Sequence, residues 1–152
     1  MYHRILVPID GSATAQRGFD EALKLAQAFD ASLVLLHVLE YQPMPMPMEV
    51  AYVTPWELIA TSLRESGQRL LDSARGSAHT AGVACEARLE ESVAARAGDV
   101  IADQASQRAC DLIVMGTHGR RGIARALIGS DAECAVRQAP CPVLLVRAPK
   151  TA

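Results

Sequence analysis

Lysine is nearly absent from this chain of 152 residues, occurring only as Lys24 and Lys150. The motif GxxxxGK[ST], whose lysine reaches the phosphates of a nucleotide, is missing as well. The formal net charge of −2 excludes the overall basic character that is typical of proteins that bind nucleic acid. We therefore expect no nucleic-acid partner, and any phosphate contact has to come from arginine side chains or backbone N–H groups.

Paired cysteines and long apolar runs are also lacking. The four cysteines have no CxxC spacing, and each lies in or beside an apolar run, where a free thiol behaves as a small hydrophobic side chain. They are Cys85, Cys110, Cys134 and Cys141. No apolar run approaches the ~20 residues of a membrane helix, and the first residues lead directly into a predicted strand rather than a signal peptide. These absences predict a reduced, cytoplasmic protein without a metal site or a membrane partner.

Short apolar runs alternate with segments of helical periodicity along the chain. Continuous runs are typical of strands buried on both faces, whereas the alternation over residues 84–89 favours an edge strand with one wet face. The predicted strands cover residues 5–9, 32–38, 84–89, 112–115 and 143–146. The predicted helices cover residues 15–29, 56–81, 94–107 and 130–138. Alternating prolines over residues 42–48 predict an irregular loop. The order of elements predicts an α/β fold, with a doubly wound parallel sheet in a single domain over residues 1–152.

Glycine and arginine are concentrated between residues 111 and 130. This stretch contains Gly116, Gly119, Gly122 and Gly129, together with Arg120, Arg121 and Arg125. An apolar strand ends at Gly116, and Ser130 opens the last helix. Glycine lets the backbone approach a ligand closely, and the N–H groups at a helix start point toward an anion. The stretch therefore predicts a nucleotide site, and we expect one of the arginines to contact a phosphate.

Ligands of doubly wound sheets lie beyond the carboxyl ends of the strands, where the winding reverses. Asp10 directly follows the first predicted strand and Gly116 ends the fourth, so we expect them to face one crevice. Asp10 is expected to face the ligand, with bracing of the turn or capping of the helix as the alternative. On the second strand we expect Val38 to contact the ligand and His37 to be a satisfied core histidine. Nothing pairs His118 with a nucleophile or an orienting carboxylate, so no catalytic role is predicted for it.

Several separated motifs resemble the ATP-binding universal stress proteins. Gly116, two residues, Gly119, nine residues and then Gly129-Ser130 match the glycine signature of that family. Residues 5–12, 111–116 and 141–146 are also similar to it. The resemblance implies a Rossmann-like, adenine nucleotide alpha hydrolase-like fold with a five-stranded parallel sheet in the order 3-2-1-4-5. It also implies a homodimer and a stress-response regulator that acts through nucleotide-dependent conformation and contacts with a still unidentified protein.

The resemblance further implies an ATP site at the matching positions. The base and ribose would lie near Pro8, Ile9, Asp10, Val38 and Met115. The phosphates would lie over Gly116, Gly119, Gly129, Ser130 and the amide of Asp131, with His118 and Arg120 completing the set. The chain departs from the family at Asp131, where a small or apolar residue is common. A carboxylate at a helix start is favourable by ~0.3–1 kcal/mol, but beside a triphosphate it repels unless Mg²⁺ bridges the two. We therefore expect ATP with Mg²⁺.

Two alternatives to this function remain open. The first is a family member that binds no ATP and works only through dimerisation and protein contacts, which Asp131 favours. The second is a slow ATP hydrolase, for which only Asp10, His118 and Asp131 could act near the phosphates. The homodimer is expected to form through the strand at residues 143–146, because an exposed edge strand pairs readily with another copy. The alternative is that the C-terminal tail covers this edge.

Overall fold

The computed structural model describes residues 1–41, 56–118 and 128–147. Its strands are β1 (Arg4–Pro8), β2 (Ser32–Glu40), β3 (Cys85–Ser92), β4 (Leu112–Gly116) and β5 (Val143–Val146). Its helices are α1 (Ala13–Phe29), α3 (Trp56–Thr80), α4 (Ala97–Gln107) and α5 (Ser130–Gln138). The predicted loop at residues 42–48, Gly119, Gly122 and the three arginines of the glycine stretch lie outside the described residues. Every predicted strand and helix is present, with small differences at the ends.

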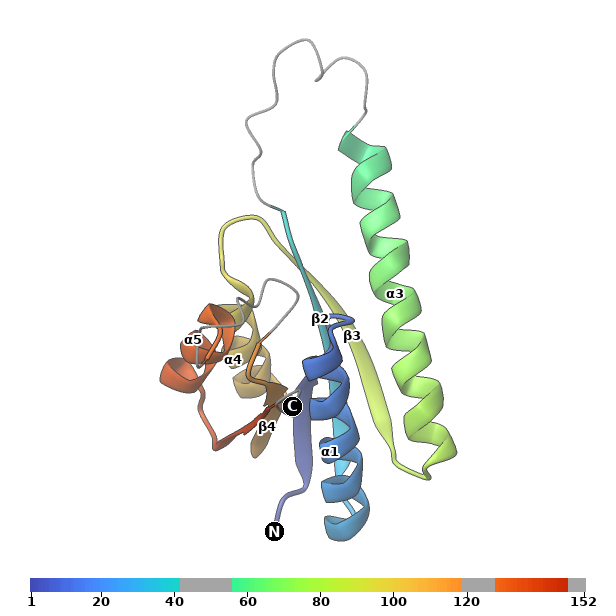
Figure 1. Ribbon diagram of the computed structural model, residues 1–152, viewed down its shortest axis with the longest axis vertical. Helices are drawn as coiled ribbons and strands as arrows, with labels where there is room; N and C mark the ends of the chain where they lie inside the picture. Colours follow the sequence, from blue (N-terminus) through green and yellow to red (C-terminus); the bar gives the residue numbers. More distant parts are fainter. Residues whose placement is uncertain (42–55, 119–127, 148–152) are drawn as a thin grey trace, which may run out of the picture.

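The five strands form one parallel sheet in the order β3-β2-β1-β4-β5 (Figure 1). The chain builds outward from β1 through β2 to β3 and then returns to the other side of β1 for β4 and β5. In the central strand β1, Ile5 pairs with Leu33 of β2 on one side and with Leu112 of β4 on the other. This arrangement confirms the predicted α/β doubly wound sheet and its strand order. The winding reverses between β1 and β4.

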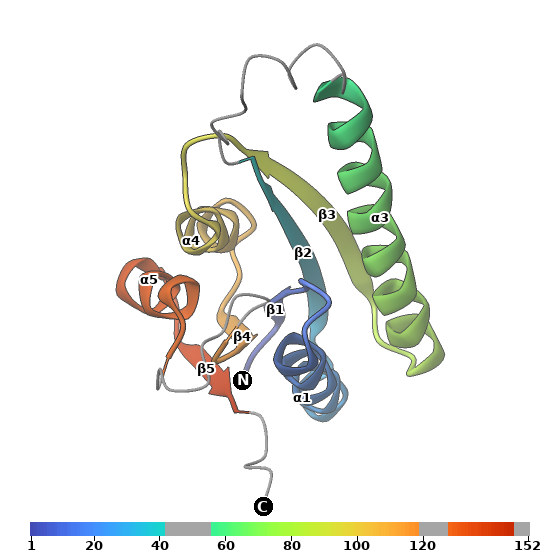
Figure 2. The same cartoon turned by 45° about the horizontal axis from the view of Figure 1, so that its top comes forward.

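The sheet is covered on both faces, with α1 and α3 on one side and α4 and α5 on the other (Figure 2). Successive residues of β1 point to opposite faces, so Ile5 and Val7 pack under α1 and α3 while Leu6 packs under α4 and α5. All three side chains have no exposed surface. The continuous apolar runs of the sequence are explained by this double burial.

The edge strand β3 is longer than predicted and ends at Ser92 rather than at residue 89. It pairs with β2 from Leu33↔Cys85 to Glu40↔Ser92, so that β2 also extends two residues beyond its predicted end. Helix α4 begins at Ala97, three residues later than predicted. The reason is a tight turn in which the Ser92 hydroxyl both accepts from the N–H of Ala95 at 3.0 Å and donates to its carbonyl at 2.8 Å.

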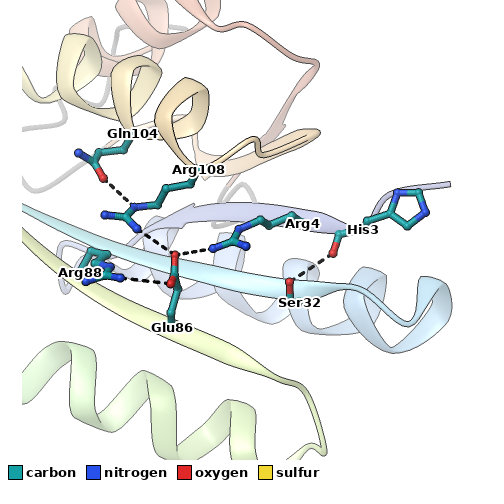
Figure 3. Close-up of polar contacts among 7 residues, drawn as sticks. All are labelled: His3, Arg4, Ser32, Glu86, Arg88, Gln104 and Arg108. Atoms are coloured by element: carbon teal, nitrogen blue, oxygen red, sulfur yellow. Dashed lines mark hydrogen bonds and ion pairs between the residues drawn. The ribbon is translucent and has the colours of Figure 1, made fainter.

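Three arginines from different elements surround one carboxylate of β3. Arg4, Arg88 and Arg108 converge on Glu86 (Figure 3), with donor–acceptor distances of 2.8, 3.4 and 3.3 Å. Burial alone would raise the pKa of Glu86, but the hydrogen bond and charge of Arg4, with the charges of Arg108 and Arg88, hold this pKa below its usual value. The cluster lies at the amino end of the sheet, away from the carboxyl ends where a ligand was predicted.

We predict that Glu86→Gln lowers the free energy of unfolding at pH 7 by about 1 kcal/mol, because the charged partner of three guanidinium groups is lost. A depressed folded-state pKa stabilises the fold above the unfolded value of about 4.3, and this contribution is lost as the pH falls through the folded value. Urea unfolding at several pH values measures the effect. The wild type and Glu86→Gln should differ at pH 7 and converge toward pH 3. A constant difference across that range would contradict the assignment.

No helix within residues 1–41, 56–118 and 128–147 is long and apolar enough to cross a membrane.

Candidate functional site

A cavity of about 640 Å³ opens at the carboxyl ends of β1, β2 and β4, next to the first turn of α5. Its volume lies within the range of about 300–1,000 Å³ that is typical of small-molecule sites. Nine of the predicted site residues line it: Pro8, Asp10, Val38, Met115, Gly116, His118, Gly129, Ser130 and Asp131. They come from four separate segments of the chain. The remaining three are Ile9, which packs into the core beneath α1, and Gly119 and Arg120, which lie outside the described residues.

The turn after β1 places Asp10 at the cavity and also uses it as a brace. One carboxylate oxygen of Asp10 accepts the N–H of Ser12 at 2.8 Å. The hydroxyl of Ser12 in turn accepts the N–H of Ala15 at 3.1 Å and so caps α1. Asp10 therefore braces the turn, as one of the two sequence interpretations expected, and it also lines the cavity.

The second wall of the cavity is formed by the end of β2. His37 is 4% exposed, and its Nδ1 lies 2.5 Å from the carbonyl oxygen of Ile9, to which it donates. This confirms that His37 is a satisfied core histidine, although the residue also belongs to the cavity lining. Val38, the next residue, is half-buried and lines the same wall. Apart from His37 and Glu40, the β2 residues that line this wall are apolar.

At the end of β4, Gly116 packs tightly against the first turn of α1. A Cβ atom on Gly116 would lie 2.7 Å from the backbone carbonyl carbon of Thr14 and 2.8 Å from its oxygen. The hydroxyl of Thr14 donates to the carbonyl of His118 just beyond this contact. The N–H of Thr117 donates to the carbonyl of Val146 at 2.9 Å. The start of the glycine stretch is therefore fixed on one side by α1 and on the other by β5.

The first turn of α5 lines the cavity, and it begins with backbone amides that precede the helix hydrogen bonds. Gly129 is the N-cap, and its own N–H already donates to the carbonyl of Thr117 at 2.7 Å. The first bond within the helix runs from the N–H of Glu133 to the carbonyl of Gly129 at 2.9 Å. The amides of residues 130–132 precede that bond, at the positive end of the helix dipole. The backbone amides of Ser130, Asp131 and Ala132 therefore all precede the helix hydrogen bonds, and Gly129 is a structural cap.

Carboxylates dominate the charge of the described cavity wall. Asp10, Glu40 and Asp131 line it, and the lining residues that the structure describes include no lysine or arginine. Glu40 was not predicted from the sequence. One of its oxygens accepts the N–H of Ala97 at 2.8 Å, at the start of α4. Within the described residues no group of three or more histidine, cysteine, aspartate or glutamate side chains could hold a metal ion.

Apolar side chains that the sequence did not single out complete the cavity. They come from the end of β2, from α3, from α4 and from the residues before α5, namely Leu39, Leu63, Ile101 and Ile128. The helical periodicity of the sequence indicated Leu63 as a core position, whereas Leu39, Ile101 and Ile128 were not identified at all. Only the packing of α3 and α4 over the carboxyl end of the sheet shows that they border a cavity. Together with Val38 and Met115 they give the cavity an apolar part in addition to the first turn of α5.

Comparisons with known proteins agree on one family. The model of the universal stress protein family matches residues 1–147. A universal stress protein of Methanocaldococcus jannaschii is 36% identical over 151 residues, which is 99% of this chain and 85% of that protein. A solved structure from the universal stress protein family of Burkholderia pseudomallei has 35% identity and a TM-score of 0.77, with 97% of each chain covered. A universal stress protein solved in complex with cAMP has 25% identity and a TM-score of 0.69, over 95% of this chain and 97% of that chain.

Proposed function

This chain belongs to the universal stress protein family, and we propose that it binds an adenine nucleotide in the cavity at the carboxyl ends of β1, β2 and β4. The observation that carries the proposal is the convergence of four separated sequence segments on one cavity. That cavity combines an apolar part with the amides of a helix start, which suits a base at one end and phosphates at the other. The complex of a similar protein with cAMP supports an adenine nucleotide as the ligand class.

We propose that the ligand is ATP and that the protein acts as a regulator in the cytoplasm. In this account, nucleotide binding changes a surface that a partner protein recognises. The four cysteines are free thiols, which is consistent with a reducing compartment. We further propose a homodimer through β5, because β5 ends the described sheet and Leu144 is 38% exposed on it.

We propose that Mg²⁺ accompanies ATP because of Asp131. This residue is the second of α5 and lines the cavity beside the amides that would hold the phosphates. Mg²⁺ is usually bound by one or two carboxylates together with phosphate oxygens. Without the metal, like charges about 4 Å apart repel by about 1–4 kcal/mol at the effective dielectric constants of protein surfaces.

Removal of Mg²⁺ with a chelator is therefore expected to lower the affinity of the wild type for ATP by about tenfold or more. Asp131→Asn removes the carboxylate, so its ATP affinity should depend on Mg²⁺ much less. Calorimetric titrations with and without the chelator measure both effects, and adenosine, which has no phosphate, serves as the ligand control. Equal dependence on Mg²⁺ in the two proteins would remove Asp131 from the metal site.

The proposed function is tested by titrating nucleotide-free protein with Mg-ATP and with cAMP. We expect saturable binding of one nucleotide per chain. Mass spectrometry of the purified protein after denaturation tests whether a nucleotide is carried from the cell. If neither nucleotide binds and none is carried, the protein is the alternative family member, which works only through dimerisation and protein contacts.

A further inference from the structure

The first turn of α4 touches both walls of the cavity. On one side, the N–H of Ala97 donates to Glu40 at the end of β2, at 2.8 Å. On the other side, Gly98 packs directly against the first turn of α5. A Cβ atom on Gly98 would lie 2.6 Å from the carbonyl oxygen of Asp131 and 2.6 Å from Cβ of Cys134. A distance below 3.0 Å to a backbone atom cannot be relieved by a change of rotamer, so α5 can come this close only because residue 98 is glycine.

The next residue, Asp99, ties the same turn to the rest of α5. Its Oδ1 accepts from Nε2 of Gln138 at 2.5 Å and from the thiol of Cys134 at 3.0 Å. Its other oxygen accepts the N–H of Arg96 at 3.2 Å and closes the start of α4. The hydrogen bonds from Cys134 and Gln138 and from the Arg96 backbone hold the pKa of Asp99 below its usual value, so it is a carboxylate at neutral pH. Gly98 thus sets the distance between the helices, and Asp99 holds the orientation of α5.

We propose that the first turn of α4 is a spacer that fixes the position of the α5 amides relative to the end of β2, and that it thereby sets the preference of the cavity for phosphorylated over unphosphorylated ligands. This inference rests on the proposed function, because it concerns the same cavity. Gly98 and Asp99 are positioning residues in it, since neither lines the cavity.

The physical reason is that the two ends of the ligand depend on different elements. Contacts to a nucleoside would come from the ends of β1, β2 and β4, which are held by the sheet itself, and from apolar side chains of α3 and α4. Contacts to phosphate would come from the amides of residues 130–132, whose place depends on how α5 packs against α4. Hydrogen bonds weaken steeply as their length and angle depart from the optimum, whereas apolar contacts are not directional. Moving α5 therefore costs affinity for phosphate and leaves nucleoside binding almost unchanged.

Gly98→Ala tests this inference, with Gly76→Ala as the matched control. A Cβ atom on Gly76, in the middle of α3, would meet no atom within 4 Å. The affinities for Mg-ATP and for adenosine are measured calorimetrically in both variants and in the wild type, with competition for the weaker ligand. In Gly98→Ala we expect about tenfold weaker ATP binding, the loss expected from one charged hydrogen bond, and less than about twofold weaker adenosine binding. Gly76→Ala should match the wild type for both ligands.

Gln138→Ala is the second variant, because it leaves the α4–α5 contact at Gly98 untouched and folds even if Gly98→Ala does not. Gln138 is exposed on the last turn of α5, away from the cavity lining. Losing its bond to Asp99 should lower the ratio of ATP to adenosine affinity by about threefold, within the range of a single hydrogen bond. An unchanged ratio in both variants, or equal losses for the two ligands, would overturn the inference alone. A wild type that binds neither ligand would overturn the proposed function and the inference with it.

Discussion

Gly116→Ala is expected to lower the free energy of unfolding by about 3 kcal/mol, at the upper end of typical overpacking costs. The added Cβ would lie 2.7 Å from the backbone of Thr14, in the first turn of α1. Neither side can yield easily, because β4 is buried in the sheet and Gly18 of α1 also packs closely against residues 115 and 116. Native stability is about 5–15 kcal/mol, so the loss is a large part of the total. Urea unfolding followed by circular dichroism measures it.

Gly76→Ala is the control for this experiment as well. It lies in a helix with open space around it, so the same substitution should raise stability by about 0.5–1 kcal/mol through lower chain entropy in the unfolded state. Opposite signs for the two glycines are the expected result. If Gly116→Ala were as stable as the wild type, the close contact of β4 with α1 would be wrong.

Ser130→Pro is expected to weaken the binding of Mg-ATP by about 10- to 100-fold, because it removes one amide donor from the start of α5. The substitution suits its position. Ser130 is the first residue of the helix, where proline is well tolerated. The preceding Gly129 has φ −73° and ψ 157°, the extended conformation that a following proline requires. Helix α5 should therefore form normally in the variant.

Ser130→Ala removes only the side-chain hydroxyl, so it distinguishes the contribution of the hydroxyl to ATP binding from that of the backbone amide. We expect Ser130→Ala to retain most of the ATP affinity, and both variants to bind adenosine as the wild type does. Calorimetry gives the affinities, and thermal unfolding shows that the fold is retained. Unchanged ATP affinity in a folded Ser130→Pro would mean that this amide does not hold a phosphate.

The sheet could be predicted from the sequence because its strands are buried on both faces. Such strands are continuous apolar runs in the sequence. When segments of helical periodicity separate these runs, only a few sheet topologies are possible. The position of the cavity followed from the same logic, since a parallel sheet that winds in two directions leaves a crevice where the direction changes. The residues that end β1 and β4 could therefore be identified from their place in the sequence.

The rest of the cavity could not be predicted because it depends on packing between distant elements. Glu40 lies at the cavity only because β2 extends beyond its predicted end, and that extension depends on pairing with β3. Leu63 has the periodicity of an ordinary core residue of α3. Ile9 follows β1 directly, yet it packs into the core, because alternate residues of an extended chain point to opposite faces. These outcomes depend on register and helix placement, which local sequence does not encode.

Two glycines also have a role that could not be predicted from the local sequence. Gly116 belongs to a motif associated with phosphate, but its surroundings here are explained by the backbone of Thr14. Gly98 is unfavourable in a helix by about 1 kcal/mol relative to alanine, and nothing in the local sequence accounts for it. The close contact of Gly98 with α5 explains why glycine occupies this position. The sequence shows where a glycine stands, but only its contact with a distant element explains why the position requires glycine.

Mapping of amide chemical shifts during a titration with Mg-ATP shows whether a nucleotide occupies this cavity. We expect saturable changes at residues 9–10, 36–40, 115–118 and 128–132, with little change around Glu86 at the opposite end of the sheet. Changes confined to other residues, or none at millimolar ATP, would contradict this expectation.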